Sequence, residues 1–397
     1  MKKISRKKIY LDYAATTPVS PGVEKAMRPY WSARFGNAGS LHSFGQEAIG
    51  AVDQSREQIA KVIRADFREI VFTGSATEAN NLAIRGVVRS WQEAHLGSGK
   101  TPRIIVSSIE HASVLETARE LEKEGVGVIY LSVDEGGYIN MKELEGSLSS
   151  DTILVSIMYG NNEIGTVQPI QKIAELVVRF RKDQKSSYPL FHTDAVQAFS
   201  YLPIYMNELE VDLATFSAHK MYGPKGVGVL FSRSLTTKNR LSPLATGGGQ
   251  EFGIRSGTEN VPLIVGCARA IEERERDRKK ETVRVSALKK YCFQKLKLVH
   301  KNIQLNGPSL EEGLPHILNV SFKEESANDL LIYLDLHDVA VSTGSACNAR
   351  SPEPSHVLGA LGLSAQRAER SVRFSFGSST KKSEINRVAS LIRQKFP

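Results

Sequence analysis

A single local pattern recurs along the first half of the chain: a short apolar run, a turn of small polar residues, and then residues with helical spacing. It occurs at residues 69–88, 103–125, 153–182 and 190–200. Strands that alternate with helices in this way are typical of βα units and of a mainly parallel sheet covered by helices. Because ligands bind at the carboxyl ends of strands in such sheets, we expect the polar turns to lie at a binding edge.

The pattern changes near residue 265. A long helical stretch over residues 261–300 is followed by fewer alternations and by a closing helical segment, KSEINRVASLIRQKF. The sequence therefore predicts an α/β chain in two parts. Residues 15–265 form the large domain, and residues 1–14 together with 266–397 form a smaller α+β domain.

Composition argues against several classes of function. The net charge is +9, but five basic residues lie among the first eight positions. The charged stretch 271–290 mixes both signs at helical spacing, which is typical of a solvated helix face rather than a nucleic-acid footprint. No segment has the apolar length of a membrane helix, and no apolar core follows the basic N-terminus. Three cysteines without a C-x-x-C pair favour a reducing cytoplasm and no metal site. We expect a cytoplasmic protein without membrane or direct nucleic-acid contact.

Lys220 is the first candidate for chemistry. It lies in VDLATFSAHKMYGPKGVGVLF (211–231), between an apolar strand and a turn rich in glycine and proline. Partial burial favours the neutral, nucleophilic amine that Schiff-base formation needs. The alternative is an ordinary surface lysine, and the neighbours Ser217 and His219 favour the first interpretation.

A second group of residues suits a pyridine cofactor. Asp194 in FHTDAVQ follows an apolar run, where its carboxylate would keep a ring nitrogen protonated, although such an aspartate is also typical of a helix N-cap. Gln197, one helical turn later, could reach the phenolic oxygen. In TGSATEANN (73–81), free N–H groups with the hydroxyls of Ser75 and Thr77 predict a phosphate seat, although any capped helix start has a similar sequence.

Three further residues complete this set. His111 in IEHAS could stack on an aromatic cofactor, although a lone histidine at such a place is more often structural. Asn162 in MYGNNEIG could donate to the same pocket, with a turn residue as the alternative. Arg373 in SVRFSFG is flanked by Val and Phe, and its burial is costly unless it meets an anion such as a substrate carboxylate. Together these residues indicate pyridoxal phosphate and an amino acid.

Ten short motifs follow one another in order over residues 10 to about 380. They are YLDYAATTP (10–18), FGNAGSLHSFG (35–45), VFTGSATEANNLA (71–83), EHASVLE (110–116), NNEIGTVQ (161–168), HTDAVQ (192–197), FSAHKMYGPKG (216–226), GGGQEFGIRSGTEN (247–260), STGSAC (342–347) and RFSFG (373–377). In these motifs the chain resembles the cysteine desulfurases of the class V aminotransferase family, which have the fold type I pyridoxal-phosphate architecture. The GSAC loop is similar to that of the group I, NifS/IscS-like branch.

The resemblance implies a role for each site residue. Lys220 would bond covalently to pyridoxal 5'-phosphate, Asp194 would pair with its ring nitrogen, and His111 would stack on the ring and take part in proton transfer. Arg373 would hold the substrate carboxylate. The remaining implied residues contact cofactor or substrate: Gln197 and Asn162 at the cofactor oxygen and the substrate; Ala76, Thr77, Ser217 and His219 at the phosphate; Thr258 at the phosphate of the partner subunit; and Asn37 near the substrate.

The implied reaction converts L-cysteine to L-alanine. The thiolate of Cys347, in a loop over about residues 341–357, would attack the substrate sulfur and carry it as a persulfide. An acceptor protein would then take the sulfur for iron–sulfur cluster assembly or for tRNA or cofactor thiolation. A homodimer with shared active sites is also implied. The chain ends at Pro397, soon after the closing helix, without the tail that docks iron–sulfur scaffolds in similar proteins, which leaves the acceptor open.

Two alternatives stay open at this stage. The same scaffold supports selenocysteine lyases and aminotransferases, although transamination needs no thiol such as Cys347. The chain could also act chiefly as a sulfur-relay or scaffold component beside tRNA-modifying machinery.

Overall fold

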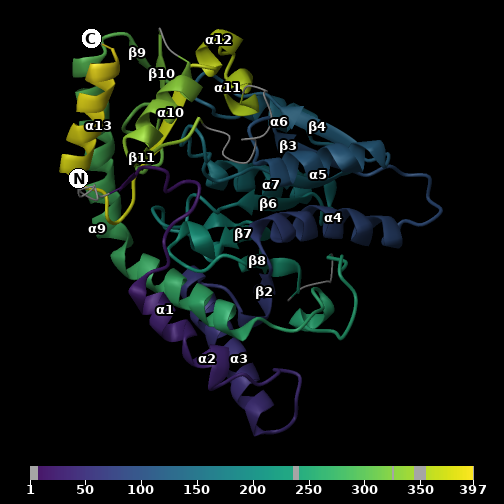
Figure 1. The fold of residues 1–397 in the computed structure, drawn as a ribbon. Coiled ribbons are helices and arrows are strands. Elements are labelled where there is room, and N and C mark those ends of the chain that lie inside the picture. Colours follow the sequence, from purple (N-terminus) through teal and green to yellow (C-terminus); the bar gives the residue numbers. More distant parts are fainter. Residues whose placement is uncertain (1–7, 236–240, 324–325, 344–354, 397) are drawn as a thin grey trace.

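A seven-stranded sheet forms the centre of the molecule (Figure 1). The computed structural model describes residues 8–235, 241–323, 326–343 and 355–396. The strand order is β2-β8-β7-β6-β5-β3-β4, and all neighbouring pairs are parallel except those of β8 with β2 and β7. The predicted α/β fold with a mainly parallel sheet is therefore confirmed. The strands are β2 (Ile70–Thr73), β3 (Arg103–Ser107), β4 (Gly127–Leu131), β5 (Thr152–Ser156), β6 (Leu190–Asp194), β7 (Leu213–Ser217) and β8 (Gly228–Ser232).

Helices cover both faces of this sheet, which is why its central strands are continuous apolar runs. In β8, Val229 and Phe231 pack into the core on one face, and Leu230 packs into the core on the other. Helices α4 and α5 cover the face of Leu230, and α3, α7 and the first part of α9 cover the opposite face. The helices of this part are α1 (Pro21–Met27), α2 (Pro29–Ser32), α3 (Ser43–Ile63), α4 (Ala76–Ala94), α5 (Ala112–Lys123), α6 (Met141–Ser147), α7 (Ile170–Gln184) and α8 (Met206–Leu209).

A second, smaller core lies beside the sheet. An antiparallel sheet of order β12-β10-β9 shares this core with residues of three helices, and β1 pairs in parallel with β11. None of the helices in the described ranges has the length and apolar character needed to cross a membrane. The elements of this part are β1 (Ile9–Tyr10), β9 (Ile303–Leu305), β10 (Ile317–Phe322), α10 (Ala327–Leu336), β11 (Val339–Ala340), α11 (His356–Ala360), α12 (Ala365–Ala368), β12 (Ser371–Ser375) and α13 (Lys382–Lys395).

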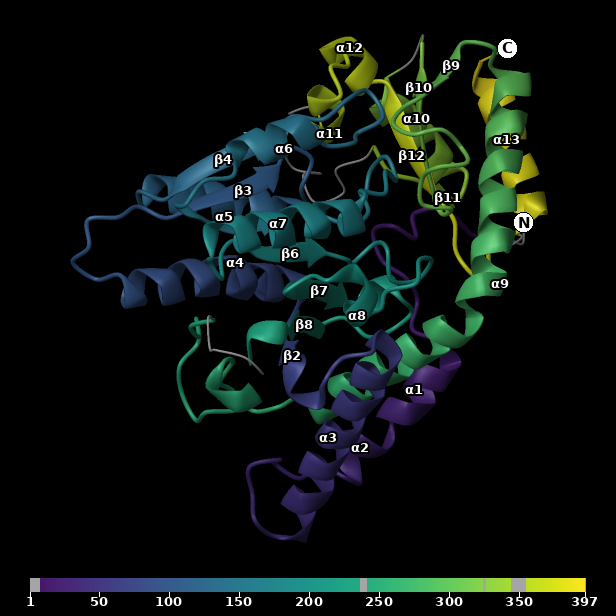
Figure 2. The same ribbon diagram turned by 180° about the vertical axis from the view of Figure 1, so that it is seen from behind.

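Helix α9 (Val261–Val299) joins the two cores without a break over 39 residues. Its residues up to Ile271 pack into the large core, and those from Val285 onward pack into the small one. Figure 2 shows it running along one side of the molecule with α13 beside its far end. The predicted boundary at residues 265/266 falls inside this helix, and the division into two domains stays a prediction.

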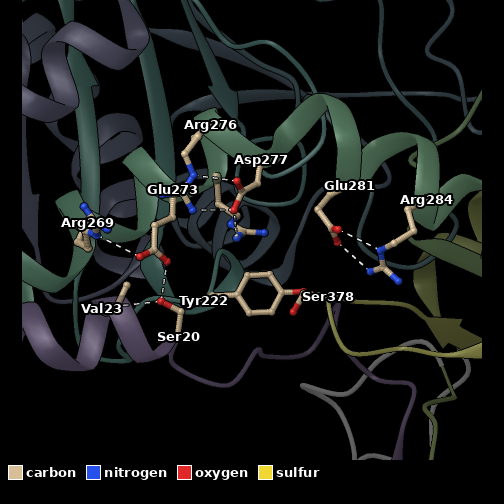
Figure 3. Close-up of polar contacts among 11 residues, drawn as sticks. Ser20, Val23, Tyr222, Arg269, Glu273, Arg276, Asp277, Glu281, Arg284 and Ser378 are labelled. Carbon is tan, nitrogen blue, oxygen red and sulfur yellow. Dashed lines mark hydrogen bonds and ion pairs between the residues drawn. The ribbon is translucent and has the colours of Figure 1, made fainter.

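Polar contacts along the middle of α9 link distant parts of the chain (Figure 3). The Glu273 carboxylate accepts hydrogen bonds from Ser20 Oγ at 2.6 Å and Arg269 Nε at 3.0 Å, which ties α9 to the start of α1. Further along, the Tyr222 hydroxyl accepts from the Ser378 backbone N–H at 2.7 Å. The turn after Lys220 is thereby fixed to the loop after β12.

Candidate active site

A cavity of about 640 Å³ opens at the carboxyl ends of β6 and β7. It is lined by side chains that come from both cores. The sequence-predicted residues that it brings together are Ala76, Thr77, His111, Asn162, Asp194, Gln197, Ser217, His219, Lys220 and Arg373. Thr258 and Asn37 do not line it, and Cys347 lies outside the described residues.

Lys220 ends a short turn that directly follows β7. Its Nζ donates to the carbonyl oxygens of Ala14 at 2.6 Å and Ala15 at 2.7 Å. Both carbonyls belong to the segment that follows β1, and the residues Ile9 and Leu11 just before them pack in the small core. The amine is therefore held at the cavity wall by backbone acceptors, at the end of a buried strand as the sequence predicts.

Asp194 is the last residue of β6 and is 5% exposed. One carboxylate oxygen accepts from the Val196 N–H at 3.0 Å, which is the turn-capping role that its position also suggested. The other accepts from Asn80 Nδ2 at 2.8 Å. Both contacts fix the position of the carboxylate at the cavity wall.

His111 is the N-cap of α5, so its structural and functional interpretations coexist. The Ser113 backbone N–H donates to its Nδ1 at 3.1 Å, which makes Nδ1 an acceptor and places the ring proton on Nε2. Ser113 Oγ lies 2.8 Å from the same nitrogen and accepts from Asn80 Nδ2 at 2.8 Å. Asn80 thus links His111 to Asp194, although sequence reasoning assigned it no role.

The predicted phosphate seat lies where α4 begins. Ser75 caps the helix by accepting from the Glu78 N–H at 3.1 Å, and the backbone at Ala76 and Thr77 forms the first turn beside the cavity. Ser217 Oγ is buried there without a hydrogen-bond partner in the described part of the chain. A Cβ on Gly228 would lie 2.8 Å from Ala76 N, so only glycine lets β8 pass this close to the helix start. A buried hydroxyl and a helix N-terminus that face one cavity fit a phosphate group.

His219, which also lines the cavity, has a neutral ring. Burial, with smaller contributions from the charges of Lys220 and Lys225, lowers the pKa of His219 to about 4. Its Nδ1 lies 3.1 Å from Thr16 Oγ1. The imidazole therefore offers the cavity a hydrogen bond rather than a charge.

Arg373 is central in β12 and is 1% exposed, as its apolar flanks predict. The anion that it meets is Asp12, whose Oδ1 lies 2.8 Å from the guanidinium, and a second N–H donates to the Asn162 carbonyl at 2.8 Å. Asp12 compensates the buried charge and fixes its position. Asp12 lies in the motif YLDYAATTP, but the sequence alone does not reveal its partner Arg373, which is 361 residues away.

Both flanks of the Cys347 segment are attached near the cavity. Ser342 pairs with Arg373 through backbone hydrogen bonds of 2.7 and 3.2 Å. Ser355 Oγ donates at 2.5 Å to the carboxylate of Glu163, a buried residue that lines the cavity. The other cysteines are unsuited to nucleophilic chemistry, because burial raises the pKa of Cys267 to about 12 and raises that of Cys292 as well.

Comparison with known proteins places this architecture in one family. The "Aminotransferase class-V" family matches residues 9–388. The chain is 44% identical over 381 residues to a protein named cysteine desulfurase IscS from Dictyoglomus turgidum, with 96% of this chain and 92% of the relative covered. It is a class-V aminotransferase of the IscS/NifS cysteine desulfurase group.

Other proteins similar to this desulfurase support the same family assignment. A putative cysteine desulfurase IscS 1 of Bacillus subtilis is 45% identical, with 93% of each chain covered. Among solved structures, a NifS-like protein superposes with a TM-score of 0.88 at 35% identity, with 98% of this chain and 99% of that chain covered. A structure described as SspA in complex with cysteine has a TM-score of 0.79 at 37% identity and covers 93% of this chain and 99% of its own.

Two predicted site residues of the desulfurase lie away from the cavity. Thr258 is exposed, and Asn37 lies in an exposed turn where its Oδ1 accepts from the Gly39 N–H at 2.9 Å. Arg255, close to Thr258, pairs with Glu78 in the first turn of α4 at 2.7 Å. This pair ties the segment of Thr258 to the phosphate seat, while the roles of Thr258 and Asn37 stay predictions.

Glu110 was missed by sequence reasoning, although it precedes His111. It is fully buried, and its Oε1 accepts from Ser107 Oγ at 2.6 Å and from the Met158 N–H at 2.8 Å. Burial raises the pKa of Glu110 to about 8, and these two hydrogen bonds offset only part of the effect. An uncharged carboxyl group therefore lies directly behind the site near neutral pH.

Proposed function

We propose that the cavity binds pyridoxal 5'-phosphate, and that the chain uses it to convert L-cysteine into L-alanine while Cys347 takes the sulfur as a persulfide. The supporting observation is a convergence in one cavity: the Lys220 amine, the buried Asp194 carboxylate, and a helix start beside the unpartnered Ser217 hydroxyl. These groups suit the aldehyde, the ring nitrogen and the phosphate of that cofactor. The similar structure of SspA with cysteine supports cysteine as the substrate.

Each of these cavity residues would have a distinct role toward the cofactor. When bound, the cofactor supplies an electron sink that makes bonds at the substrate Cα and Cβ labile. Lys220 would be joined to it and, once released, would move the proton at Cα with its amine. Asp194, held in place by Asn80, would pair with the ring nitrogen and keep it protonated. The phosphate would be bound by Ser217 Oγ, the His219 ring and the N–H groups of Ala76 and Thr77.

The substrate would be oriented by residues from both cores. Arg373, fixed by Asp12, would bind the carboxylate, and the Asn162 and Gln197 side chains would hydrogen-bond the cofactor oxygen and the amino acid. His111 would stack on the ring and move protons through Nε2, because its Nδ1 is occupied by Ser113.

Sulfur transfer is assigned to Cys347 by exclusion of the two buried thiols. Its thiolate would attack the substrate sulfur. A new S–S bond forms, the C–S bond breaks, and its electron pair goes to the carbon, which takes a proton to give alanine. The persulfide would then pass to an acceptor protein for iron–sulfur cluster assembly or thiolation. The unpaired thiols Cys267 and Cys292 support a reducing cytoplasmic location.

The test is the loss of sulfide formation in Cys347→Ser. With pyridoxal phosphate, L-cysteine and a thiol reductant, the wild-type protein should release sulfide and alanine in equal amounts. Cys347→Ser should keep the visible absorption of the bound cofactor and lose at least ~100-fold in sulfide formation, because hydroxyl oxygen cannot replace the thiolate.

The matched control is Cys292→Ala, which removes a buried thiol remote from the cavity and should keep the activity. Full sulfide production by Cys347→Ser would overturn the assignment of the sulfur carrier. Failure of the wild-type protein to bind the cofactor would overturn the whole proposal.

We also propose a homodimer in which Thr258 completes the partner's phosphate site. Thr258 is exposed and does not line the cavity of its own chain. Large apolar side chains are exposed within residues 31–44, which supports an interface nearby. They are Trp31 at 58%, Phe35 at 67%, Leu41 at 92% and Phe44 at 52% exposure.

A further inference from the structure

His316 is a buried histidine that the proposed mechanism does not use. It precedes β10, in the small core, and is 3% exposed. Its ring stacks on Tyr201, with centroids 4.2 Å apart and planes inclined by 17°. The Tyr201 hydroxyl donates to the Phe376 carbonyl at 3.3 Å, and the Phe376 N–H donates to the His316 carbonyl at 2.9 Å. The ring is therefore held rigidly, and its Nε2 lies 3.1 Å from Gln197 Oε1.

The direction of this hydrogen bond follows from the second polar atom of the Gln197 amide, the one that does not face His316. This atom lies 3.0 Å from the Ala14 carbonyl oxygen, which can only accept hydrogen bonds and which already accepts one from Lys220. The atom beside it must be the amide nitrogen, because a second oxygen at this distance would be repelled. Oε1 consequently faces His316, and His316 Nε2 must carry the proton.

The protonation state of the ring agrees with this assignment. Burial, with smaller contributions from the charges of Lys289, Arg373 and Lys220, lowers the pKa of His316 well below its usual value. The ring is neutral and carries one proton. Its Nδ1 is buried without a hydrogen-bond partner in the described part of the chain, so a proton there would be unsatisfied.

We propose that His316 is a positioning residue that, together with the Ala14 carbonyl, fixes the Gln197 amide, so that an N–H and not the carbonyl oxygen faces the cofactor site. Within the described residues, one N–H of the amide is taken by Ala14, and the second is left for a ligand. The inference rests on the proposed cofactor. It adds a residue of the small core that acts through Gln197 and lies outside the cavity lining.

A pair of variants separates positioning from packing. In His316→Gln, the side-chain nitrogen lies near the place of the histidine Nε2 and keeps the donor. In His316→Asn, the shorter side chain places its nitrogen near the Nδ1 position and loses the bond to Gln197. The measurement is the pH titration of the visible absorption of the lysine-bound cofactor, because an N–H donor to the cofactor oxygen lowers the apparent pKa.

We expect His316→Asn to raise that apparent pKa by about 0.5 to 1 unit, the equivalent of one hydrogen bond, and His316→Gln to restore it. In a Gln197→Ala background, His316→Asn should cause no further shift. Equal shifts in both His316 variants, or a shift that persists in the Gln197→Ala background, would overturn the proposal.

Folding and cofactor binding are checked separately. Near-ultraviolet circular dichroism shows whether each variant is native, and if His316→Asn is not, His316→Leu replaces it as the donor-free variant that fills the same space. If wild-type protein takes up no cofactor, the proposed function fails instead, and the two failures are thus distinguished.

Discussion

Asn80 lies between the two groups most central to the proposed chemistry. Its Nδ2 donates both to Asp194 and to Ser113, which in turn contacts His111. Its own Oδ1 is buried without a partner among the described residues, an arrangement that costs stability. One amide thus aligns a carboxylate and an imidazole from different strand ends at the expense of an unsatisfied oxygen.

Glu110 predicts how stability depends on pH. The native state binds its proton more tightly than the unfolded chain, because burial raises the pKa from an ordinary 4.5 to about 8. This contribution is fully present below pH 4.5 and is lost as the pH rises toward 8, with a slope of at most about 1.4 kcal/mol per pH unit. Glu110→Gln should remove that slope, as measured by denaturant unfolding of the cofactor-free protein at pH 5.5 and 7.5.

The control for this prediction is Glu57→Gln, which changes an exposed carboxylate on α3. It should follow the wild-type pH dependence. If the wild type and Glu110→Gln lose the same free energy of unfolding between the two pH values, Glu110 is not the buried acid described here.

At the scale of elements, residues at the N-termini of helices position several groups of the site. Ser355 caps α11 by accepting from the Leu358 N–H at 3.2 Å, and the same hydroxyl donates to Glu163. Ser364 caps the next helix, α12, by accepting from the Arg367 N–H at 3.3 Å, and it does not itself line the cavity. The two serines share a capping role, but only Ser355 links the end of the Cys347 segment to the cavity.

This difference supports a matched prediction. Ser355→Ala and Ser364→Ala should each lose about 1 kcal/mol of stability from the lost cap. Only Ser355→Ala should slow persulfide formation on Cys347, by about tenfold in single-turnover experiments, because the Glu163 anchor is lost. Cofactor absorption should be unchanged in both. Equal persulfide rates in the two variants would show that the anchor does not position the thiol.

The helices and strands were predictable where neighbouring residues in the sequence determine them. Lys220, Asp194 and the start of α4 follow apolar runs, and the periodicity of those runs fixes where strands end. Asp12 and His316 were not found, because what defines them is a partner on another element, 361 residues away for Asp12 and 119 for His316. Single-sequence periodicity carries no information on such pairs.

At the scale of the whole molecule, the apolar residues exposed between 31 and 44 predict the oligomeric state. Leu41→Asp should convert the proposed dimer to monomers in sedimentation velocity, because it places a charge on a side chain that is 92% exposed in the isolated chain. Cofactor affinity should fall at the same time, since Thr258 would no longer complete the neighbouring site.

The control for the dimer is Leu96→Asp, at a residue 84% exposed in the connection between α4 and β3. It should sediment as the wild type does. Dimers that persist in Leu41→Asp would place the interface elsewhere.

The pairing of β1 with β11, and of Asp12 with Arg373, has a consequence for biosynthesis. Asp12 is synthesised 361 residues before Arg373, a delay on the order of tens of seconds at ordinary translation rates. Until then, the Ala14 and Ala15 carbonyls that hold Lys220 have no support from the small core. We therefore expect the contacts of Lys220 to reach their final arrangement only after nearly the whole chain has been synthesised.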